Sequence, residues 1–152
     1  MRKTMSTLFA TLALFIGGLV MAPTASAAGY GCSGNLIDTY DVKTSGGVKY
    51  GVVYLYYSTA NGGTNCAVTV DTYFGTSTTK HMAIFIGRCA AGSVEGQSCS
   101  QDQYTSDSGR YTSYAGPRSV TGAASRCVTL NGVIHNPSGT SLAQVVTLAV
   151  HC

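Results

Sequence analysis

The sequence predicts an all-β fold, a small antiparallel β-sandwich or barrel of about seven strands that is stapled by disulfides. Three observations lead to this fold class. Apolar and polar residues alternate with a period of two after residue 27, in segments rich in β-branched and aromatic residues. Clusters of Gly, Asn and Ser separate these segments, as turns separate strands. Six cysteines follow residue 27, an even number typical of small exported domains.

The N-terminal residues have the features of a secretory signal peptide. Arg2 and Lys3 precede the apolar run LFATLALFIGGLVMA, which is short for a membrane span, and the small-residue motif Ala25–Ala27 follows it. We therefore predict a signal peptide at residues 1–27 and a single β domain at residues 28–152. No second apolar span follows, so we expect a secreted, extracellular protein with no membrane span after cleavage.

Removal of the signal peptide leaves a nearly neutral chain. It keeps seven Lys or Arg residues and six Asp or Glu residues, a net charge of +1. Nucleic acids and anionic membrane surfaces are bound by dense basic faces, which this composition does not supply. We therefore expect no nucleic-acid partner and no polybasic membrane site.

The strands expected in the first half of the domain are separated by clear turns. NLIDTYDV (35–42) and KYGVVYLYYS (49–58) flank the turn TSGGVK. The Asn-Gly-Gly sequence at 61–63 is a hairpin signal before the segment TNCAVTVDTYF (64–74). One face of that segment is predicted to carry Cys66, Val68, Val70 and Phe74.

The second half is expected to contain four further strands. HMAIFIGRC (81–89) alternates so that Met82, Ile84 and Ile86 share a face. Residues 93–108 are expected to be the longest irregular segment, with Asp107–Gly109 as a turn that opens a tyrosine-bearing strand. RCVTLNGVIH and LAQVVTLAVHC flank the turn NPSGTS. The last segment is predicted to place on one face Leu142, Val146, Leu148 and Val150.

The cysteines are expected to form three disulfides, because no C-x-x-C spacing indicates zinc. If the last hairpin turns at Gly139 and Thr140, Cys127 lies opposite Cys152 within the reach of a disulfide. Cys89 and Cys99 flank the Gly-rich loop AAGSVEGQS and are predicted to pair with each other, because a short loop is closed at a small entropic cost. Elimination then pairs Cys32 with Cys66.

Ser108 is the first candidate for catalysis, because Asp-Ser-Gly surrounds the nucleophile of many serine proteases and His151 lies in a protease-like "AVHC". The outer glycines that usually help to form the oxyanion hole are replaced by Ser106 and Arg110. The domain is also short for a double barrel with a substrate cleft. We therefore predict that the protein is not an enzyme.

The remaining ionisable residues give no stronger site. The histidines His81, His135 and His151 lack the spacing of a chelating pair, and Asp38 and Asp41 lie in one strand-to-turn segment. We therefore predict no metal and no cofactor.

The tyrosines are the most unusual feature, since all ten follow residue 27. Four of them are the candidate binding residues for a sugar or protein surface, namely Tyr54, Tyr56, Tyr111 and Tyr114. The alternative is structural, because tyrosine forms strands well and must supply core bulk in a chain without Trp.

Several motifs carry a resemblance to a known family. They are GCSGNLIDTY, GVVYLYYSTANGGTNCAVTV, DSGRYTSYAGPRSV, RCVTLNGVI and the terminal HC. Over most of residues 30–152 the chain resembles the actinobacterial spore-associated protein A family, small exported proteins of spore-forming filamentous bacteria. The resemblance implies four shared cysteines, so Cys89 and Cys99 are an addition. Arg118 stands where the family pattern implies an apolar residue.

The function expected from these observations is that of a secreted, non-enzymatic protein associated with the spore or cell surface, with wall polymers or surface proteins as partners. One alternative is a carbohydrate- or wall-binding module that uses the four tyrosines. A second is a secreted protease inhibitor, with AAGSVEGQS as its exposed loop. A small hydrolase based on Ser108 or the acids is the least supported.

Overall fold

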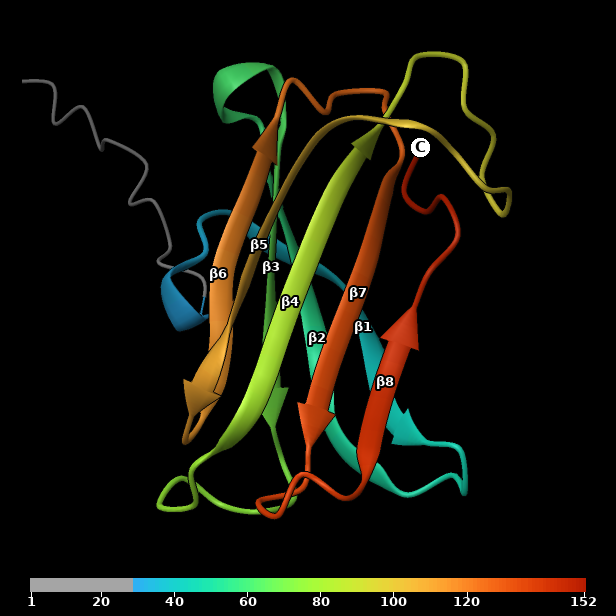
Figure 1. Cartoon of the computed structure of the whole chain (residues 1–152). Helices are drawn as coiled ribbons and strands as arrows, with labels where there is room; N and C mark the ends of the chain where they lie inside the picture. The colour runs from blue at the N-terminus through green and yellow to red at the C-terminus, as the bar shows by residue number, and fades with distance from the viewer. Residues whose placement is uncertain (1–28) are drawn as a thin grey trace, which may run out of the picture.

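The computed structural model describes residues 29–152, so the predicted signal peptide lies outside the described residues. These residues form eight antiparallel strands in one sheet that curls into a nearly closed barrel (Figure 1). The strands are β1 (Asn35–Thr44), β2 (Lys49–Ser58), β3 (Thr64–Asp71), β4 (Lys80–Cys89), β5 (Gln101–Tyr111), β6 (Tyr114–Thr121), β7 (Val128–His135) and β8 (Leu142–Val146). Two short 3-10 turns are η1 (Gly29–Gly31) and η2 (Ala60–Gly62). The all-β prediction is confirmed, with one strand more than expected.

The barrel interior is formed by the residues that period-two alternation places on one face of each strand. Met82, Ile84 and Ile86 of β4 are fully buried, in one cluster with Val53 and Leu55 of β2. Each such side chain contributes about 1.5–3 kcal/mol to folding by leaving water. The predicted inward face of β4 is confirmed.

The outer side of β3 is also buried, unlike that of an ordinary half-exposed strand. Cys66, Val68 and Val70 form a second cluster with Tyr56 and Cys32, while Ala67 faces the main core. The η1 turn lies beside this part of the sheet (Figure 1). The expected alternation is correct up to Val70, but the strand ends at Asp71. Phe74 therefore lies beyond the strand and packs against the main core.

The strand that the sequence analysis missed is β5. We expected residues 93–108 to be irregular and Asp107–Gly109 to be a turn, but Gln101–Tyr111 pairs with β4 along its whole length. The prediction is wrong because the inward positions of β5, apart from Tyr111 at its end, carry no apolar side chain. Register with β4 places there the polar or small residues Gln103, Thr105, Asp107 and Gly109.

The last strand is shorter and faces the other way from our expectation. β8 ends at Val146, and its inward residues are the smaller Ala143 and Val145. Leu142, Val146 and Leu148 lie exposed on the outside, and of the predicted apolar face only Val150 packs against the main core. The pairing with β7 is displaced by two residues, since Asn131 lies opposite Val146 instead of Leu148.

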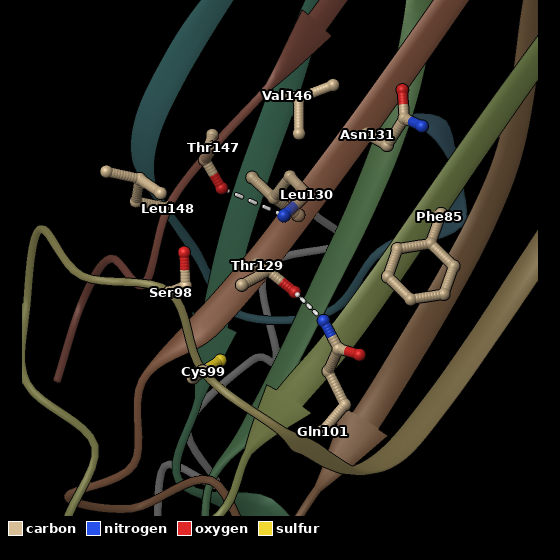
Figure 2. A pocket seen from close by; sticks show the side chains of 10 residues that line it. All are labelled: Phe85, Ser98, Cys99, Gln101, Thr129, Leu130, Asn131, Val146, Thr147 and Leu148. Atoms are coloured by element: carbon tan, nitrogen blue, oxygen red, sulfur yellow. Dashed lines mark hydrogen bonds between the residues drawn. The ribbon is translucent and has the colours of Figure 1, made fainter.

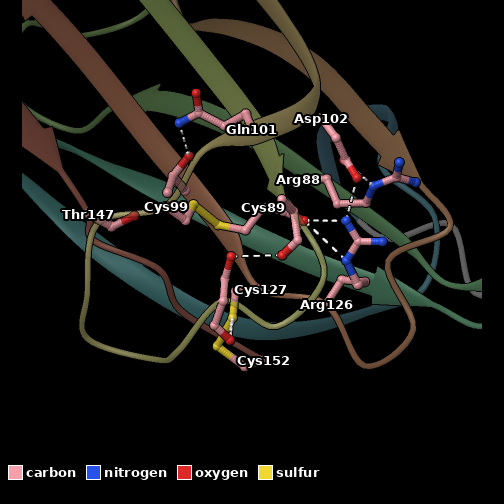
Figure 3. Close-up of a disulfide and its surroundings, with 12 residues drawn as sticks. Arg88, Cys89, Cys99, Gln101, Asp102, Arg126, Cys127, Thr147 and Cys152 are labelled. Carbon is pink, nitrogen blue, oxygen red and sulfur yellow. Dashed lines mark hydrogen bonds and ion pairs between the residues drawn. A yellow bond between two sulfur atoms is a disulfide. The ribbon is translucent and has the colours of Figure 1, made fainter.

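All three predicted disulfides are present, Cys32–Cys66, Cys89–Cys99 and Cys127–Cys152. The irregular segment after Val146 offsets the displaced register, so that the last pair still meets. Figure 3 shows the second and third disulfides side by side. The N–H of Cys89 donates to the carbonyl of Cys127 at 2.9 Å, which couples the two covalent links through one backbone contact.

The barrel is closed between β5 and β6 by side chains. These strands are the two edges of the sheet, and within residues 29–152 no strand ladder joins them. Asp107 of β5 accepts the N–H of Gly116 at 2.8 Å and pairs with Arg118 of β6 at 3.2 Å. The N–H of Thr121 donates to Gln103 Oε1 at 3.0 Å. Arg118 thus has a role that explains a charged residue where an apolar one was expected.

A second narrow junction lies between β1 and β8. They pair at two positions, Lys43 with Gln144 and Thr44 with Ala143. Beyond these positions the strands diverge, and His151 Nε2 lies 3.0 Å from Asp38 Oδ2 across the opening. Side chains therefore complete the barrel wherever its ladders end.

A buried ion pair lies at the end of the barrel near the turn between β5 and β6. Lys80 Nζ is 2.8 Å from Asp71 Oδ2, and both side chains are almost completely buried. Lys80 also donates to the carbonyls of Thr78 at 2.8 Å and Thr112 at 2.6 Å, while the Asp71 carboxylate accepts the N–H of Phe74 at 3.0 Å. Buried charges are tolerated only with such a shell of partners.

Candidate binding site

The best candidate for a binding site lies on the outer face of β4 and β7. The register places Phe85 beside Asn131 and Gly87 beside Thr129. On its other side, Gly87 lies opposite Tyr104 of β5. Because neighbouring residues of a strand face opposite sides, these residues point away from the core that Ile84 and Ile86 fill.

A groove of about 380 Å³ occupies this face (Figure 2). Its residues come from the middle of the sheet, from the loop before β5 and from the segment after β8. We call it the outer groove, and it is lined by Phe85, Ser98, Cys99, Gln101, Thr129, Leu130, Asn131, Val146, Thr147 and Leu148.

The floor of the outer groove depends on a glycine. A Cβ at Gly87 would lie 2.6 Å from Gln101 Cγ and 3.1 Å from Thr129 Oγ1. Without it, Gln101 lies against the sheet and its Nε2 donates to Thr129 Oγ1 at 3.1 Å (Figure 2). The glycine thus allows the Gln101 amide to approach the sheet closely and holds the groove open.

The walls of the outer groove are held by the chain on both sides. On one side the Cys89–Cys99 disulfide fixes the loop that carries Ser98, and Gln101 follows that loop as the first residue of β5. On the other side the N–H of Leu130 donates to Thr147 Oγ1 at 2.9 Å, which positions the segment after β8 (Figure 2).

An ion-pair network lies beside the Cys89–Cys99 disulfide, next to this wall of the groove (Figure 3). Asp102 pairs with Arg88 at 2.8 Å and with Arg126, and these two hydrogen-bonded cations hold the pKa of the Asp102 carboxyl below its ordinary value. Arg126 also donates to the Cys89 carbonyl, with Nε at 3.1 Å. Two guanidinium groups thus share one carboxylate, and none of the three charged residues is among those that line the groove.

An aromatic pair extends the outer groove toward β5. The rings of Phe85 and Tyr104 are stacked, with centroids 5.9 Å apart and planes 26° apart. Tyr104 is 71% exposed, the largest exposed fraction among the exposed large hydrophobic residues in the described part of the chain. A flat ring that stays in water on a rigid strand is available to stack on a ligand.

The tyrosines that the sequence analysis singled out lie elsewhere. Tyr54 stacks against Tyr30 of η1, with centroids 5.7 Å apart, and Tyr30 also meets Tyr114 at 5.3 Å. Tyr56 is only 6% exposed, and burial, with a smaller effect of Tyr30 and Tyr54, raises the pKa of its hydroxyl. Tyr114 is 38% exposed.

The fourth of these tyrosines, Tyr111, lies apart from that cluster. Its hydroxyl donates to Asp107 at 2.9 Å, and this hydrogen bond raises the pKa of Tyr111. The structure therefore brings together Tyr54, Tyr56 and Tyr114, whereas Tyr111 meets only Tyr114, with which it lines a separate hollow at the turn between β5 and β6. Tyr54 and Tyr56 contribute largely to packing, as expected if the tyrosines have a structural role. Ligand binding by the four tyrosines stays a prediction.

Ser108 lies on the exposed face of β5, with its Oγ 3.1 Å from His81 Nε2. The ring of His81 meets that of His135 edge to face at 5.1 Å, and His81 Nδ1 is buried without a hydrogen-bond partner among residues 29–152. His151 instead contacts Asp38. The structure thus pairs the serine with a different histidine from the one considered, and no described carboxylate orients that histidine as a triad requires.

The two acids considered as a pair have separate partners. Partial burial opposes ionisation of Asp38, but hydrogen bonds from His151 and the Thr39 N–H outweigh it and lower the pKa of that carboxyl. Asp41 is exposed and its pKa is lowered by Lys43 and Lys49. Within residues 29–152 there is no cluster of three His, Cys, Asp or Glu residues suited to a metal ion.

The loop suggested for protease inhibition consists of two turns. The N–H of Ser93 donates to Ala90 O at 3.3 Å, and the N–H of Gln97 donates to Val94 O at 3.2 Å. The N–H of Gly96 and the carbonyl of Gln97 also bond to Ala149, at 2.8 and 2.9 Å. The loop is therefore folded onto the C-terminal segment, which gives no support to an extended inhibitory segment.

Sequence reasoning did not find the residues of the outer groove. The available signal was Tyr104, a lone aromatic residue in the otherwise polar segment QDQYTSDSGR. It was missed because that segment was not recognised as a strand. No sequence pattern indicated that Gln101 and Asn131 belong to a binding site, because only the register between strands brings them to one face.

Fold and surface together define a class: small, disulfide-linked, all-β domains with a neutral groove on the outside of the barrel. The "Spore-associated protein A" of Streptomyces coelicolor (strain ATCC BAA-471 / A3(2) / M145) is 36% identical over 145 residues, 90% of this chain and 82% of the relative. The chain belongs to the spore-associated protein A family, which confirms the resemblance.

Other comparisons add no further relationship. No family model matches the chain, and no solved structure matches it. Among the described residues, no helix has the length and apolar character that crossing a membrane requires.

Proposed function

We propose that this chain is an exported, non-enzymatic protein that associates with the surface of spores or cells. Membership of the spore-associated protein A family is the observation that carries the proposal. The three disulfides support it, because such links persist outside the cell and not in a reducing cytosol. Export depends on the signal peptide predicted at residues 1–27.

The non-enzymatic role is supported by the surroundings of Ser108. The side chain lies on an exposed strand face and not in one of the larger hollows. An acyl-transfer site also needs backbone donors for the oxyanion and a group that orients the histidine. On this proposal Ser108→Ala leaves surface association unchanged.

Cell fractionation tests the proposal. The full-length chain, with its own N-terminal segment, is expressed in a spore-forming host, and spores, mycelial walls and medium are separated and probed by immunoblot. We expect the protein to sediment with spores or walls and to resist a low-salt wash. Protein recovered only in the medium, or retained in the cytosol with reduced cysteines, contradicts the proposal.

A further inference from the structure

We propose that the outer groove is a binding site for an uncharged polysaccharide, with Tyr104 and Phe85 as its stacking surface. This inference deepens the proposed function, because it names the class of surface polymer to which the protein attaches. It differs from the tyrosine-based alternative, since the groove lies on β4, β5 and β7 and not on the strands that carry Tyr54, Tyr56 and Tyr114.

The neutral lining is the first argument for this ligand. None of the ten lining residues is charged. An ionic ligand would lose hydration here without gaining an opposite charge from the lining, since the nearby Arg88 and Arg126 both already pair with Asp102. The groove is therefore complementary to an uncharged ligand.

The mixture of polar and apolar lining is the second argument. Phe85, Val146 and Leu148 offer apolar surface, and Val146 is 66% exposed. Between them lie the amides of Gln101 and Asn131. A purely apolar ligand would leave these amides without partners, at a cost in free energy. A sugar ring meets both requirements, since it has an apolar C–H face and a rim of hydroxyls.

The amides are held in position before a ligand arrives. Gln101 Nε2 donates to Thr129 at 3.1 Å, and Gln144 Nε2 donates to Asn131 Oδ1 at 3.0 Å. Within residues 29–152 this leaves Gln101 Oε1 and Asn131 Nδ2 without a hydrogen-bond partner. The groove thus presents one fixed acceptor and one fixed donor, which suits recognition of neighbouring hydroxyls.

The position of the groove in the sheet argues against an extended peptide. Peptides commonly add as a further strand to a free sheet edge. Phe85 and Asn131 lie on β4 and β7, whose backbones are both paired on two sides. A ligand in the groove is therefore recognised by side chains alone, as a saccharide chain lying across an aromatic surface is.

Retention on insoluble polysaccharides tests this inference directly. The disulfide-bonded protein is incubated with cellulose and chitin, which are uncharged, and with purified peptidoglycan as a charged comparison, and the bound fraction is measured against protein concentration. We expect retention on cellulose or chitin, and we expect Tyr104→Ala or Asn131→Ala to weaken it about tenfold or more, as loss of a binding hot spot does. Retention on peptidoglycan alone contradicts the inference. Tyr104→Ala removes an exposed ring, so the fold should be unchanged by circular dichroism.

Tyr114→Ala is the matched control, because it removes a partly exposed tyrosine outside the groove. We expect it to bind as the unchanged protein does. Loss of retention in Tyr114→Ala but not in Tyr104→Ala overturns the inference in favour of the tyrosine cluster. Absence of retention on every polymer, or equal retention by all variants, overturns it as well.

One further measurement separates this inference from the proposed function. Titration with soluble chito- and cello-oligosaccharides should shift the NMR signals of the Gln101 and Asn131 side-chain amides before any others. If these signals do not move while fractionation still finds the protein on spores or walls, surface association stands and the glycan site is rejected.

Discussion

At the scale of single residues, Lys80 is the clearest case of a side chain whose role depends on complete burial. It joins three parts of the chain, because its ammonium contacts Asp71 at the end of β3, Thr78 before β4 and Thr112 in the turn after β5. A charge in the interior is held by these contacts and destabilises the fold when one partner is removed.

We predict that Lys80→Met lowers the free energy of unfolding by about 3 kcal/mol or more, because Asp71 then remains buried without its counter-charge. Urea denaturation followed by tyrosine fluorescence measures the loss. Lys49→Met is the control, since its pair with Asp41 is exposed and its removal should leave the midpoint unchanged. Equal midpoints for the two variants would contradict the assigned role of Lys80.

The contact of Asp38 with His151 predicts a pH dependence of stability. The pKa of Asp38 in the folded protein lies below its ordinary value, so its ionised form stabilises the fold above about pH 4. This contribution is lost as the pH falls through the folded-state pKa.

Asp38→Asn should therefore be less stable than the unchanged protein at pH 5–7, and the difference should shrink between about pH 4 and pH 2. Thermal melts across this pH range measure it. A difference that stays constant or grows on acidification would show that Asp38 does not act through its charge.

At the scale of strands, the prediction from sequence was best where apolar alternation is strong. β4 was correct because Met82, Ile84 and Ile86 all face the core. β5 was missed because its inward positions, such as Thr105 and Asp107, face the gap toward β6 and need no apolar side chain. Hydrophobic periodicity reveals a strand only where one face of that strand is buried and apolar. A strand that closes a barrel through polar contacts lacks this pattern.

Register was the second limit on prediction at this scale. The displacement of two residues between β7 and β8 keeps the alternation, so the sequence pattern alone does not distinguish the two pairings. The observed pairing places Val146 beside Asn131 and so forms one side of the outer groove. The candidate site could therefore not be predicted from the sequence, although most of the strands that form it were predicted.

The side-chain closure between β5 and β6 gives a prediction about local opening. Asp107→Ala removes the acceptor of the Gly116 N–H, at a cost of about 1.5 kcal/mol or more for a bond to a charged group. Exchange of the Gly116 amide hydrogen should then be roughly tenfold faster or more. Native-state hydrogen exchange by NMR measures it.

Asp102→Ala is the matched control for this experiment. It removes a carboxylate of the same strand that pairs with Arg88 and Arg126 and does not contact β6. Exchange at Gly116 should not change in this variant. If both variants accelerate exchange to the same extent, the effect belongs to the stability of β5 as a whole and not to the closure.

At the scale of the whole molecule, three covalent links stabilise a domain with many small and polar residues. Two were supported by local sequence reasoning, whereas Cys32–Cys66 followed by elimination and could not be derived from any local pattern. Its partners meet because Cys32, which directly follows η1, packs against Cys66, Val68 and Val70 on the outer side of β3. No local sequence pattern indicates that tertiary contact.

Replacing disulfides with serine pairs should separate stability from binding. On the loop-entropy model, Cys32–Cys66 with its separation of 34 residues contributes about 4 kcal/mol, and Cys89–Cys99 with its separation of 10 contributes about 3 kcal/mol. Denaturant titration should therefore find the first pair of substitutions more destabilising. Polysaccharide retention should respond in the opposite order, because only Cys89–Cys99 holds a wall of the outer groove. Loss of retention in the Cys32–Cys66 variant alone would contradict this assignment.

The turn of Thr112 and Ser113 has a consequence for how the protein behaves in a crowded environment. These two residues connect the opposite edges of an eight-stranded sheet, so the sheet cannot flatten while the chain is intact. Open strand edges promote aggregation. One proteolytic cut between Thr112 and Ser113 would leave side-chain contacts, such as those of Asp107 with Gly116 and Arg118, to hold the two edges together. Loss of those contacts would then expose both edges to a neighbouring chain.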